Sequence, residues 1–173
     1  IAGTPTRVSD HDPVRLRISV PAFRSADLAA TAFIIGPNPV RLDETATFVA
    51  TITNTGPSIA DSASIALVFD ALVAPSLVVP DGWTCAAPVQ NAGSTTITCT
   101  TPLFEPSPSS VSFDASIPID LALANRTIRM DVAVTSLTLD TANANNQAST
   151  AVETLANADL RVQASASAPT VDV

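Results

Sequence analysis

The sequence predicts an all-β protein in which two sheets pack face to face, and three observations support this prediction. Fourteen Pro are scattered along the 173 residues and leave no gap long enough for several helices. Thr, Ser and Val are abundant, which suits half-solvated sheets. From residue 45 onward, apolar and polar residues alternate with the two-residue period of a strand.

Four segments show this alternation most clearly. Their apolar positions are Phe48, Ala50 and Ile52; Ile65, Leu67 and Phe69; Val111, Phe113, Ala115 and Ile117; and Ile128, Met130, Val132 and Val134. Gly, Pro, Asn and Ser gather in the turns between segments, at 36–39, 54–57, 80–82, 91–93 and 106–108. Strands with one apolar face need a second sheet to cover that face. We therefore expect an Ig-like β-sandwich of about seven antiparallel strands, with N- and C-terminal extensions.

Charge divides the chain into two unlike parts. Residues 1–24 hold four Arg and two Asp, a net charge of +2, whereas the remainder holds four Arg and 14 acidic residues, a net charge of −10. Nucleic-acid affinity comes largely from Lys and Arg that neutralise phosphates, so we expect no direct nucleic-acid binding by the sandwich. No apolar run approaches the ~20 residues of a membrane-spanning helix, and we expect no membrane span.

The two cysteines, Cys85 and Cys99, flank a turn-rich segment. They could pair across neighbouring strands, and closing a loop of about 15 residues would contribute roughly 3 kcal/mol. The alternative is a pair of buried free thiols; we predict the disulfide. Because disulfides persist in oxidising compartments, we expect an extracellular or cell-surface location, with the periplasm as the alternative.

A short internal repeat marks the parts of the chain. Ala26-Asp27-Leu28 recurs 132 residues later as Ala158-Asp159-Leu160. We therefore predict three parts: residues 1–24 as the C-terminal remnant of a different, preceding domain with a linker, residues 25–156 as one sandwich repeat, and residues 157–173 as the first strand of a following repeat.

Several short motifs within residues 25–156 occur in a characteristic order. After Ala-Asp-Leu come Thr-Ile-Thr-Asn-Thr-Gly-Pro-Ser-Ile-Ala-Asp at 51–61, Gly-Trp-Thr-Cys at 82–85, Ile-Thr-Cys at 97–99, and Asp140 followed by Asn145-Asn146. Together they resemble the bacterial surface repeat family catalogued as "domain of unknown function eleven", which consists of Ig-like sandwiches strung along secreted and cell-surface proteins. The resemblance implies an architecture, a location and neighbouring repeat domains as partners, and it implies no chemistry.

The N-terminal segment carries a different resemblance. Ser9-Asp10-His11 contains the only histidine and runs into Arg15-Leu16-Arg17-Ile18. It resembles the closing motif of the endonuclease/exonuclease/phosphatase superfamily, in which the matching histidine lies beside the scissile phosphate and the matching aspartate orients it or the metal. An imidazole with a near-neutral pKa can exchange a proton there.

This second resemblance makes Asp10 and His11 catalytic only within an intact parent nuclease, whose body would lie upstream, and inactive in this chain. The alternative is an exposed turn before Pro13, an ordinary role for residues that precede proline.

Two further candidates have a functional and a structural interpretation. Trp83 could be a glycan-stacking platform, but we expect it to pack in the core against the Cys85–Cys99 bridge, as the Trp of an Ig core does. The loop oxygens of Asp140, Asn143, Asn145 and Asn146 hint at calcium. Calcium sites normally use several carboxylates, and Asn also favours turns, so we expect a turn, no metal and no cofactor.

These inferences lead to one leading function and two alternatives. We expect a non-catalytic spacer or accessory module of a secreted or cell-surface bacterial protein, C-terminal to an extracellular nuclease, and not an enzyme. One alternative is a ligand-binding or adhesion module for a glycan, calcium or a protein. The other is a fragment of a metal-dependent phosphodiesterase or nuclease whose catalytic body is absent here.

Overall fold

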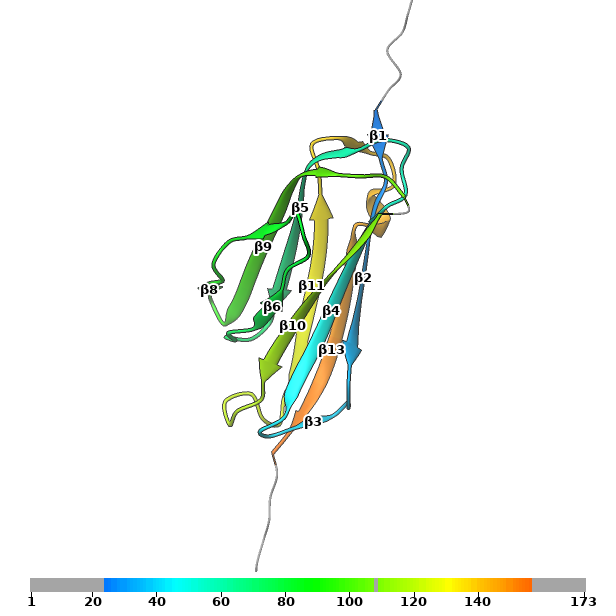
Figure 1. The fold of residues 1–173 in the computed structure, drawn as a ribbon. Coiled ribbons are helices and arrows are strands. Elements are labelled where there is room, and N and C mark those ends of the chain that lie inside the picture. Colours follow the sequence, from blue (N-terminus) through cyan, green and yellow to red (C-terminus); the bar gives the residue numbers. More distant parts are fainter. Residues whose placement is uncertain (1–23, 108, 157–173) are drawn as a thin grey trace, which may run out of the picture.

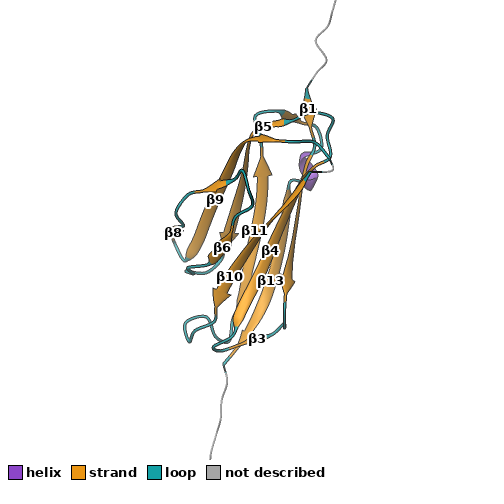
Figure 2. Ribbon diagram, viewed as in Figure 1, coloured by secondary structure: helices purple, strands orange, loops and turns teal. Residues whose placement is uncertain are grey.

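The computed structural model describes residues 24–107 and 109–156 of the chain. Their elements, in chain order, are β1 (Ser25–Ala26), β2 (Leu28–Ile35), β3 (Val40–Arg41), β4 (Thr45–Asn54), β5 (Ala60–Phe69), β6 (Ser76–Val78), β7 (Thr84–Cys85), β8 (Val89–Asn91), β9 (Ser94–Phe104), β10 (Ser110–Pro118), β11 (Thr127–Thr135), β12 (Leu139–Asp140), the 3₁₀-helix η1 (Asn143–Asn145) and β13 (Gln147–Leu155). Figure 2 shows that almost all of this regular structure is strand. The predicted all-β class is confirmed.

The strands form two main sheets, as expected of a sandwich. One sheet has the order β2-β4-β10-β6, and the other has the order β3-β13-β11-β5-β9-β7, with β8 also paired to β9. Seven strands, β2, β4, β5, β9, β10, β11 and β13, have eight to eleven residues, and the pairings among them are antiparallel. The predicted Ig-like sandwich is therefore the observed fold.

Two short pairings depart from the expected antiparallel pattern. β1 pairs with β12 in parallel, and β3 pairs with β13 in parallel. Both two-residue strands flank β2, and each pairs outside the sheet to which β2 belongs. β1 and β12 form a separate two-stranded sheet, and β3 lies at the edge of the sheet that contains β13, so the chain leaves the sheet of β2 and β4 at both ends of β2.

The core lies between the sheets and is built from the alternating positions. Phe48 of β4 and Phe69 of β5 meet edge to face across the sheets, with ring centroids 5.5 Å apart. The predicted apolar positions of all four segments are buried, except Val111, which is partly buried. Because a one-residue slip would turn these side chains to solvent, the alternation fixes the register of the strands.

Trp83 and the disulfide lie in the same sandwich. Cys85 and Cys99 are directly opposite each other in the β7–β9 pairing and form a disulfide, as predicted. The indole of Trp83 is buried and lies edge to face with Phe104 of β9 and Phe113 of β10, at centroid distances of 5.8 and 5.3 Å. Trp83 therefore belongs to the core, where it connects the two sheets.

The described chain enters and leaves the sandwich at opposite ends (Figure 1). We call the end with β1, the turn 54–59 and the loop 135–146 the N-terminal pole. We call the end with the segments 36–44 and 119–126 and the end of β13 the C-terminal pole. The long strands run between the poles, so the molecule is elongated along the direction of the chain ends.

Candidate functional site

A hollow with a volume of about 650 Å³ lies against β5, β11 and β13. Its charged residues, Arg129 and Asp131, bind each other: Nη2 of Arg129 lies 2.6 Å from Oδ1 of Asp131, and Nε donates to the same oxygen. Within the described residues, no group of three or more His, Cys, Asp or Glu side chains could hold a metal. The two charged side chains of this hollow are therefore paired with each other.

A polar cluster at the N-terminal pole joins three segments that are far apart in the sequence. We call Asp27, Asn54, Thr55, Asp140 and Asn145 the Asp27 cluster. Asp27 Oδ1 accepts a hydrogen bond from Asn145 Nδ2 at 2.9 Å, and Oδ2 accepts one from Thr55 Oγ1 at 2.8 Å. Its backbone is also bound, because Thr55 N donates to Asp27 O at 2.7 Å. Asp27 thus ties the start of the chain's first long strand to two loops.

Asn54 is the buried member of this cluster. Its Nδ2 donates to the carbonyl oxygens of Ser58 and Phe104, at 2.9 and 3.0 Å. Its Oδ1 accepts from the backbone N–H groups of Asp27 and Gly56. A buried amide costs free energy unless its groups are paired, and here both ends are paired. Asn54 therefore fixes the turn 54–58 against the start of β2 and the end of β9.

Gly56 is required at its position because the backbone of another segment lies against it. A Cβ at Gly56 would lie 2.4 Å from Asp27 N and 2.5 Å from the carbonyl carbon of Ala26. Real Cβ atoms do not approach backbone atoms this closely, so only glycine lets β1 and the turn meet.

The loop that hinted at calcium has a structural role. Asp140 Oδ2 accepts from Leu28 N and Oδ1 accepts from Ala142 N, at 2.9 and 2.8 Å. Asn145 uses its amide nitrogen to bind Asp27, while its own Oδ1 and that of Asn146 are buried without a hydrogen-bond partner among the described residues. The carboxylate of Asp140 therefore serves as an acceptor for backbone N–H groups that connect the loop to β2.

Electrostatics at the cluster favour a charged Asp27. The hydrogen bond from Asn145, and next the one from Thr55, hold the pKa of the Asp27 carboxyl below its usual value, while desolvation opposes them weakly. The cluster is therefore stabilised by an ionised carboxylate.

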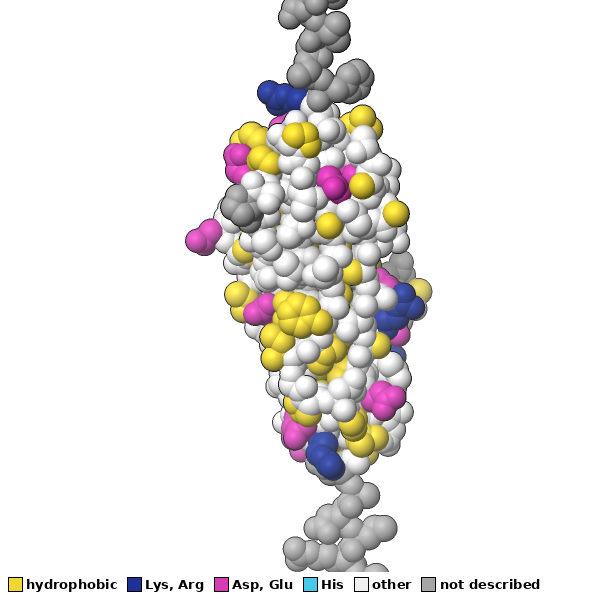
Figure 3. Space-filling model, turned by 90° about the vertical axis from the view of Figure 1, so that its right-hand side faces the viewer, with side chains coloured by type: hydrophobic (Ala, Val, Ile, Leu, Met, Phe, Trp, Pro, Cys, Tyr) yellow, Lys and Arg dark blue, Asp and Glu magenta, His cyan; other side chains and the backbone are white. Residues whose placement is uncertain are grey.

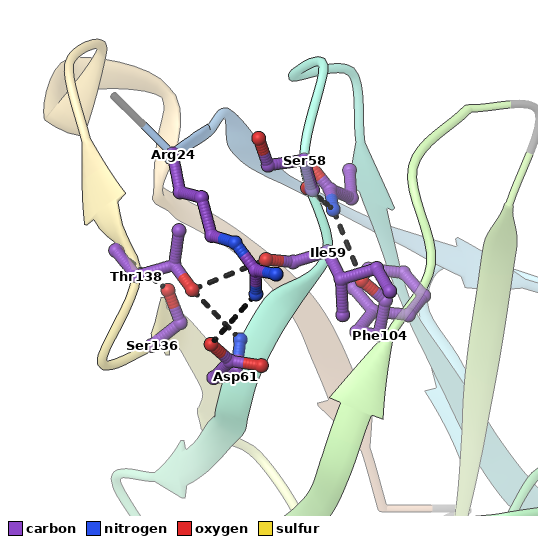
Figure 4. A network of polar contacts seen from close by, with 8 residues as sticks. Arg24, Ser58, Ile59, Asp61, Phe104, Ser136 and Thr138 are labelled. Carbon is purple, nitrogen blue, oxygen red and sulfur yellow. Dashed lines mark hydrogen bonds and ion pairs between the residues drawn. The ribbon is translucent and has the colours of Figure 1, made fainter. Parts of the chain in front are cut away.

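A second network anchors the segment 136–138 beside this cluster (Figure 4). Thr138 Oγ1 accepts from Asp61 N at 2.9 Å and donates to Ile59 O at 3.1 Å, and Ser136 Oγ donates to Thr138 O at 2.9 Å. The guanidinium of Arg24 lies 3.9 Å from the Asp61 carboxylate, and both side chains are exposed. An exposed pair of this kind stabilises little, so the anchoring comes from Thr138.

The sequence-predicted residues thus have different outcomes. The Cys85–Cys99 disulfide is confirmed, and the ring partners of Trp83 in the core are Phe104 and Phe113. Asp10 and His11 lie outside the described residues, as do residues 157–173.

Sequence reasoning did not predict that Asp27, Asn54 and Gly56 meet. The available signal was that all three lie in the short motifs of the surface-repeat resemblance.

Comparisons with known proteins give structural likenesses only. No family model matches the sequence, and no curated protein matches it. The chain is similar to the crystal structure of a CARDB domain from Pyrococcus furiosus in complex with di-metal ions, with 14% identity, a TM-score of 0.48, and coverage of 79% of this chain and 95% of that one. It is also similar to a DUF4466 family protein from Parabacteroides merdae, with 10% identity, a TM-score of 0.47, and coverage of 74% and 44%. Likenesses of this size say nothing about function.

The surface of the described residues adds two observations. Figure 3 shows hydrophobic side chains in small separate patches on one face, among polar groups. Within residues 24–107 and 109–156, which the structure describes, no helix is long and apolar enough to cross a membrane.

Proposed function

We propose that the chain is a non-catalytic Ig-like spacer or accessory module of a secreted or cell-surface bacterial protein, C-terminal to an extracellular nuclease. The observation that supports the spacer role best is the placement of chain entry and exit at opposite poles of an elongated sandwich (Figure 1). A domain inserted in this way separates whatever precedes it from whatever follows it by the length of its strands, about 3.3 Å per residue.

The internal contacts support a role in which the module keeps its shape. The Asp27 cluster and Thr138 use their polar groups to bind other parts of the same chain, and a disulfide links β7 to β9. A disulfide is compatible with an extracellular location, where it would persist.

The alternative of a glycan-binding module is less well supported. The sequence offered Trp83 as a stacking platform, and the structure buries Trp83 between Phe104 and Phe113. We therefore propose the spacer ahead of the binding module.

A domain-exchange experiment tests the spacer role. The chain is displayed on a bacterial surface between a wall anchor and an N-terminal epitope, and antibody access to the epitope is measured. We expect equal access when residues 25–156 are replaced by an unrelated β-sandwich of the same length, and lower access when they are deleted. Loss of a surface function on exchange, with access unchanged, would contradict the spacer role and favour a binding module.

The link to a nuclease needs its own test, because it rests on the resemblance of Asp10 and His11. The chain and a form extended by its natural upstream region are compared for metal-dependent cleavage of plasmid DNA. We expect only the extended form to cleave, and we expect His11→Ala to abolish that cleavage. An extended form that contains a second sandwich and does not cleave would remove the nuclease from the proposal.

A further inference from the structure

Exposed leucines surround the point where the chain enters the sandwich. Leu137 is 82% exposed, Leu103 55% and Leu139 54%. Leu137 N donates to Asp61 O, and Asp61 pairs with Leu103 across β5 and β9. Leu137 and Leu103 therefore lie on either side of Asp61. Leu139 pairs with Ser25, the first residue of β1. A hollow of about 270 Å³ opens beside them, with Leu137, Leu139 and Asp140 in its lining.

The C-terminal pole also exposes leucines where the chain leaves. Leu155 ends β13 and is 40% exposed, although its carbonyl oxygen accepts a hydrogen bond from Leu42 N. Leu121 is 78% exposed in the segment 119–126. That segment is held firmly, because Asp120 Oδ1 accepts the N–H groups of the two residues that follow Leu121. Both poles therefore present apolar side chains on fixed backbone.

The internal repeat predicts that the C-terminal pole lies close to the N-terminal pole of a following repeat. The 132-residue offset that relates Ala26 to Ala158 makes Asn157 the counterpart of Ser25, where β1 begins. Only Ala156 then separates the end of β13 from the residue that matches Ser25. Two residues span at most about 7 Å, so in a following repeat that folds as residues 25–156 do, the N-terminal pole would lie against the C-terminal pole of this one.

The residue at the junction also suits a close approach. Ala156 is the counterpart of Arg24, whose side chain is 74% exposed at the N-terminal pole. At the junction between repeats, alanine stands where the long cation would be, which removes both bulk and charge from the contact.

We propose that the C-terminal pole docks onto the N-terminal pole of a following copy of this repeat, with Leu121 and Leu155 against the leucines at positions 103, 137 and 139 of that copy. The proposal rests on the spacer function and names its partner. Burying leucines that are exposed in a single repeat favours the contact, and the short junction reduces the entropy lost on docking. Consecutive repeats then form a stiff rod in place of domains that reorient freely.

A two-repeat protein tests this docking. Residues 1–156 are followed directly by a second copy of residues 25–173, which keeps the natural offset, and residual dipolar couplings are measured for both repeats. Docking predicts one shared alignment tensor. Insertion of Gly-Ser-Gly-Ser after Ala156 should abolish the shared tensor, because the poles no longer have to touch. The proposal would be overturned if the two repeats of the protein without the insertion had alignment tensors that differ as much as those of the insertion variant.

Substitutions on each side of the junction locate the contact. We expect L137S/L139S in the second repeat to lose the shared tensor, and L121S in the first repeat to do the same. The matched control is V78S/V89S, which changes two exposed valines away from the poles and should keep the shared tensor. Thermal unfolding of the 173-residue chain with each set of substitutions checks that the sandwich persists. Retention of the shared tensor in both pole variants would disprove the leucine contact.

The outcome is separable from the spacer test. A flexible junction together with unchanged epitope access on domain exchange would reject docking and retain the spacer. A shared tensor together with a surface function lost on domain exchange would retain docking and reject the spacer.

Discussion

Between the two sheets, Trp83 lies edge to face with Phe104 and Phe113, and all three rings belong to the apolar core. At the N-terminal pole, by contrast, Asp27 and Asn54 hold the turn 54–58, the loop 135–146 and the end of β9 through hydrogen bonds to side chains and backbone. The first region is stabilised by area removed from water, a contribution that is roughly independent of pH and has no preferred direction. The second depends on donors and acceptors at fixed positions, and on one ionised carboxylate.

The difference shows how this chain divides two tasks. Burial between the sheets supplies most of the stability, since apolar burial is the dominant favourable contribution in folding. The polar pole fixes where β1 and the loop 135–146 lie, because hydrogen bonds are directional. Loss of a core ring should therefore weaken the whole fold, whereas loss of a pole contact should loosen one end.

Phe113→Ala should produce the largest effect. Phe113 is fully buried and contacts Trp83, so its truncation leaves a cavity between the sheets. We expect the free energy of unfolding to fall by about 3–5 kcal/mol, measured by urea denaturation. The matched control is Phe33→Ala, in which the ring is half exposed, and which should change stability by less than about 1 kcal/mol. Similar losses for the two variants would contradict this description of the core.

Removal of the disulfide should have the next largest effect. Cys85→Ala together with Cys99→Ala opens a loop of about 15 residues, and we expect a loss of roughly 3 kcal/mol. The wild-type chain should lose a similar amount in the presence of reductant, whereas the double variant should not respond to reductant. A wild-type unfolding curve that is the same with and without reductant would show that the bridge contributes nothing.

The sequence was sufficient to predict the fold because the apolar residues of the main strands follow one period. Phe48, Ala50 and Ile52 alternate with threonines, and all three are buried in β4. Segments without large apolar residues were harder to delimit. β13 reads Gln-Ala-Ser-Thr-Ala-Val-Glu-Thr-Leu, and its place as a strand comes from its pairing with β11, which no local pattern encodes.

The Asp27 cluster could not be predicted as a unit for a different reason. Asp27 and Asn145 are 118 residues apart, and Asp27 and Thr55 are 28 apart. Their motifs were visible in the sequence, but their meeting depends on how the loops of two sheets end at the same pole. Asp140 and Asn145 were therefore interpreted from local chemistry, as a turn or a calcium loop, and their contacts to Leu28 and Asp27 were not foreseen.

Gly56→Ala should loosen the pole more than the core. The added methyl group would lie 2.4 Å from Asp27 N, so β1 or the turn must move, at a cost of about 1–3 kcal/mol. Hydrogen exchange measured by NMR should show faster exchange at the amides of Asp27 and Thr55, with Ile65 in β5 nearly unchanged in conditions where local opening dominates. Uniform acceleration at all three amides would mean that the pole and the core unfold as one unit.

Asp27→Asn should have the smallest effect at neutral pH and the clearest dependence on pH. The variant keeps the size of the side chain but loses the negative charge that accepts from Asn145 and Thr55, and we expect a loss of about 1 kcal/mol at pH 7. Because folding lowers the pKa of Asp27, its carboxylate stabilises the fold above the unfolded value of about 3.9, and this contribution is lost as the pH falls through the lower folded value.

The difference in stability between wild type and Asp27→Asn should therefore be constant above about pH 5 and shrink as the pH falls below the unfolded pKa. Urea denaturation at a series of pH values from neutral to acidic measures it. The control is Asp81→Asn, which removes a carboxylate from the turn before Trp83 and none of the hydrogen bonds of the Asp27 cluster; the change with pH for Asp27→Asn should exceed the change for this variant. The pole differs from the core in this respect, since the cost of Phe113→Ala should not depend on pH. A constant difference for Asp27→Asn down to low pH would mean that shape, and not the ionised carboxylate, holds the pole.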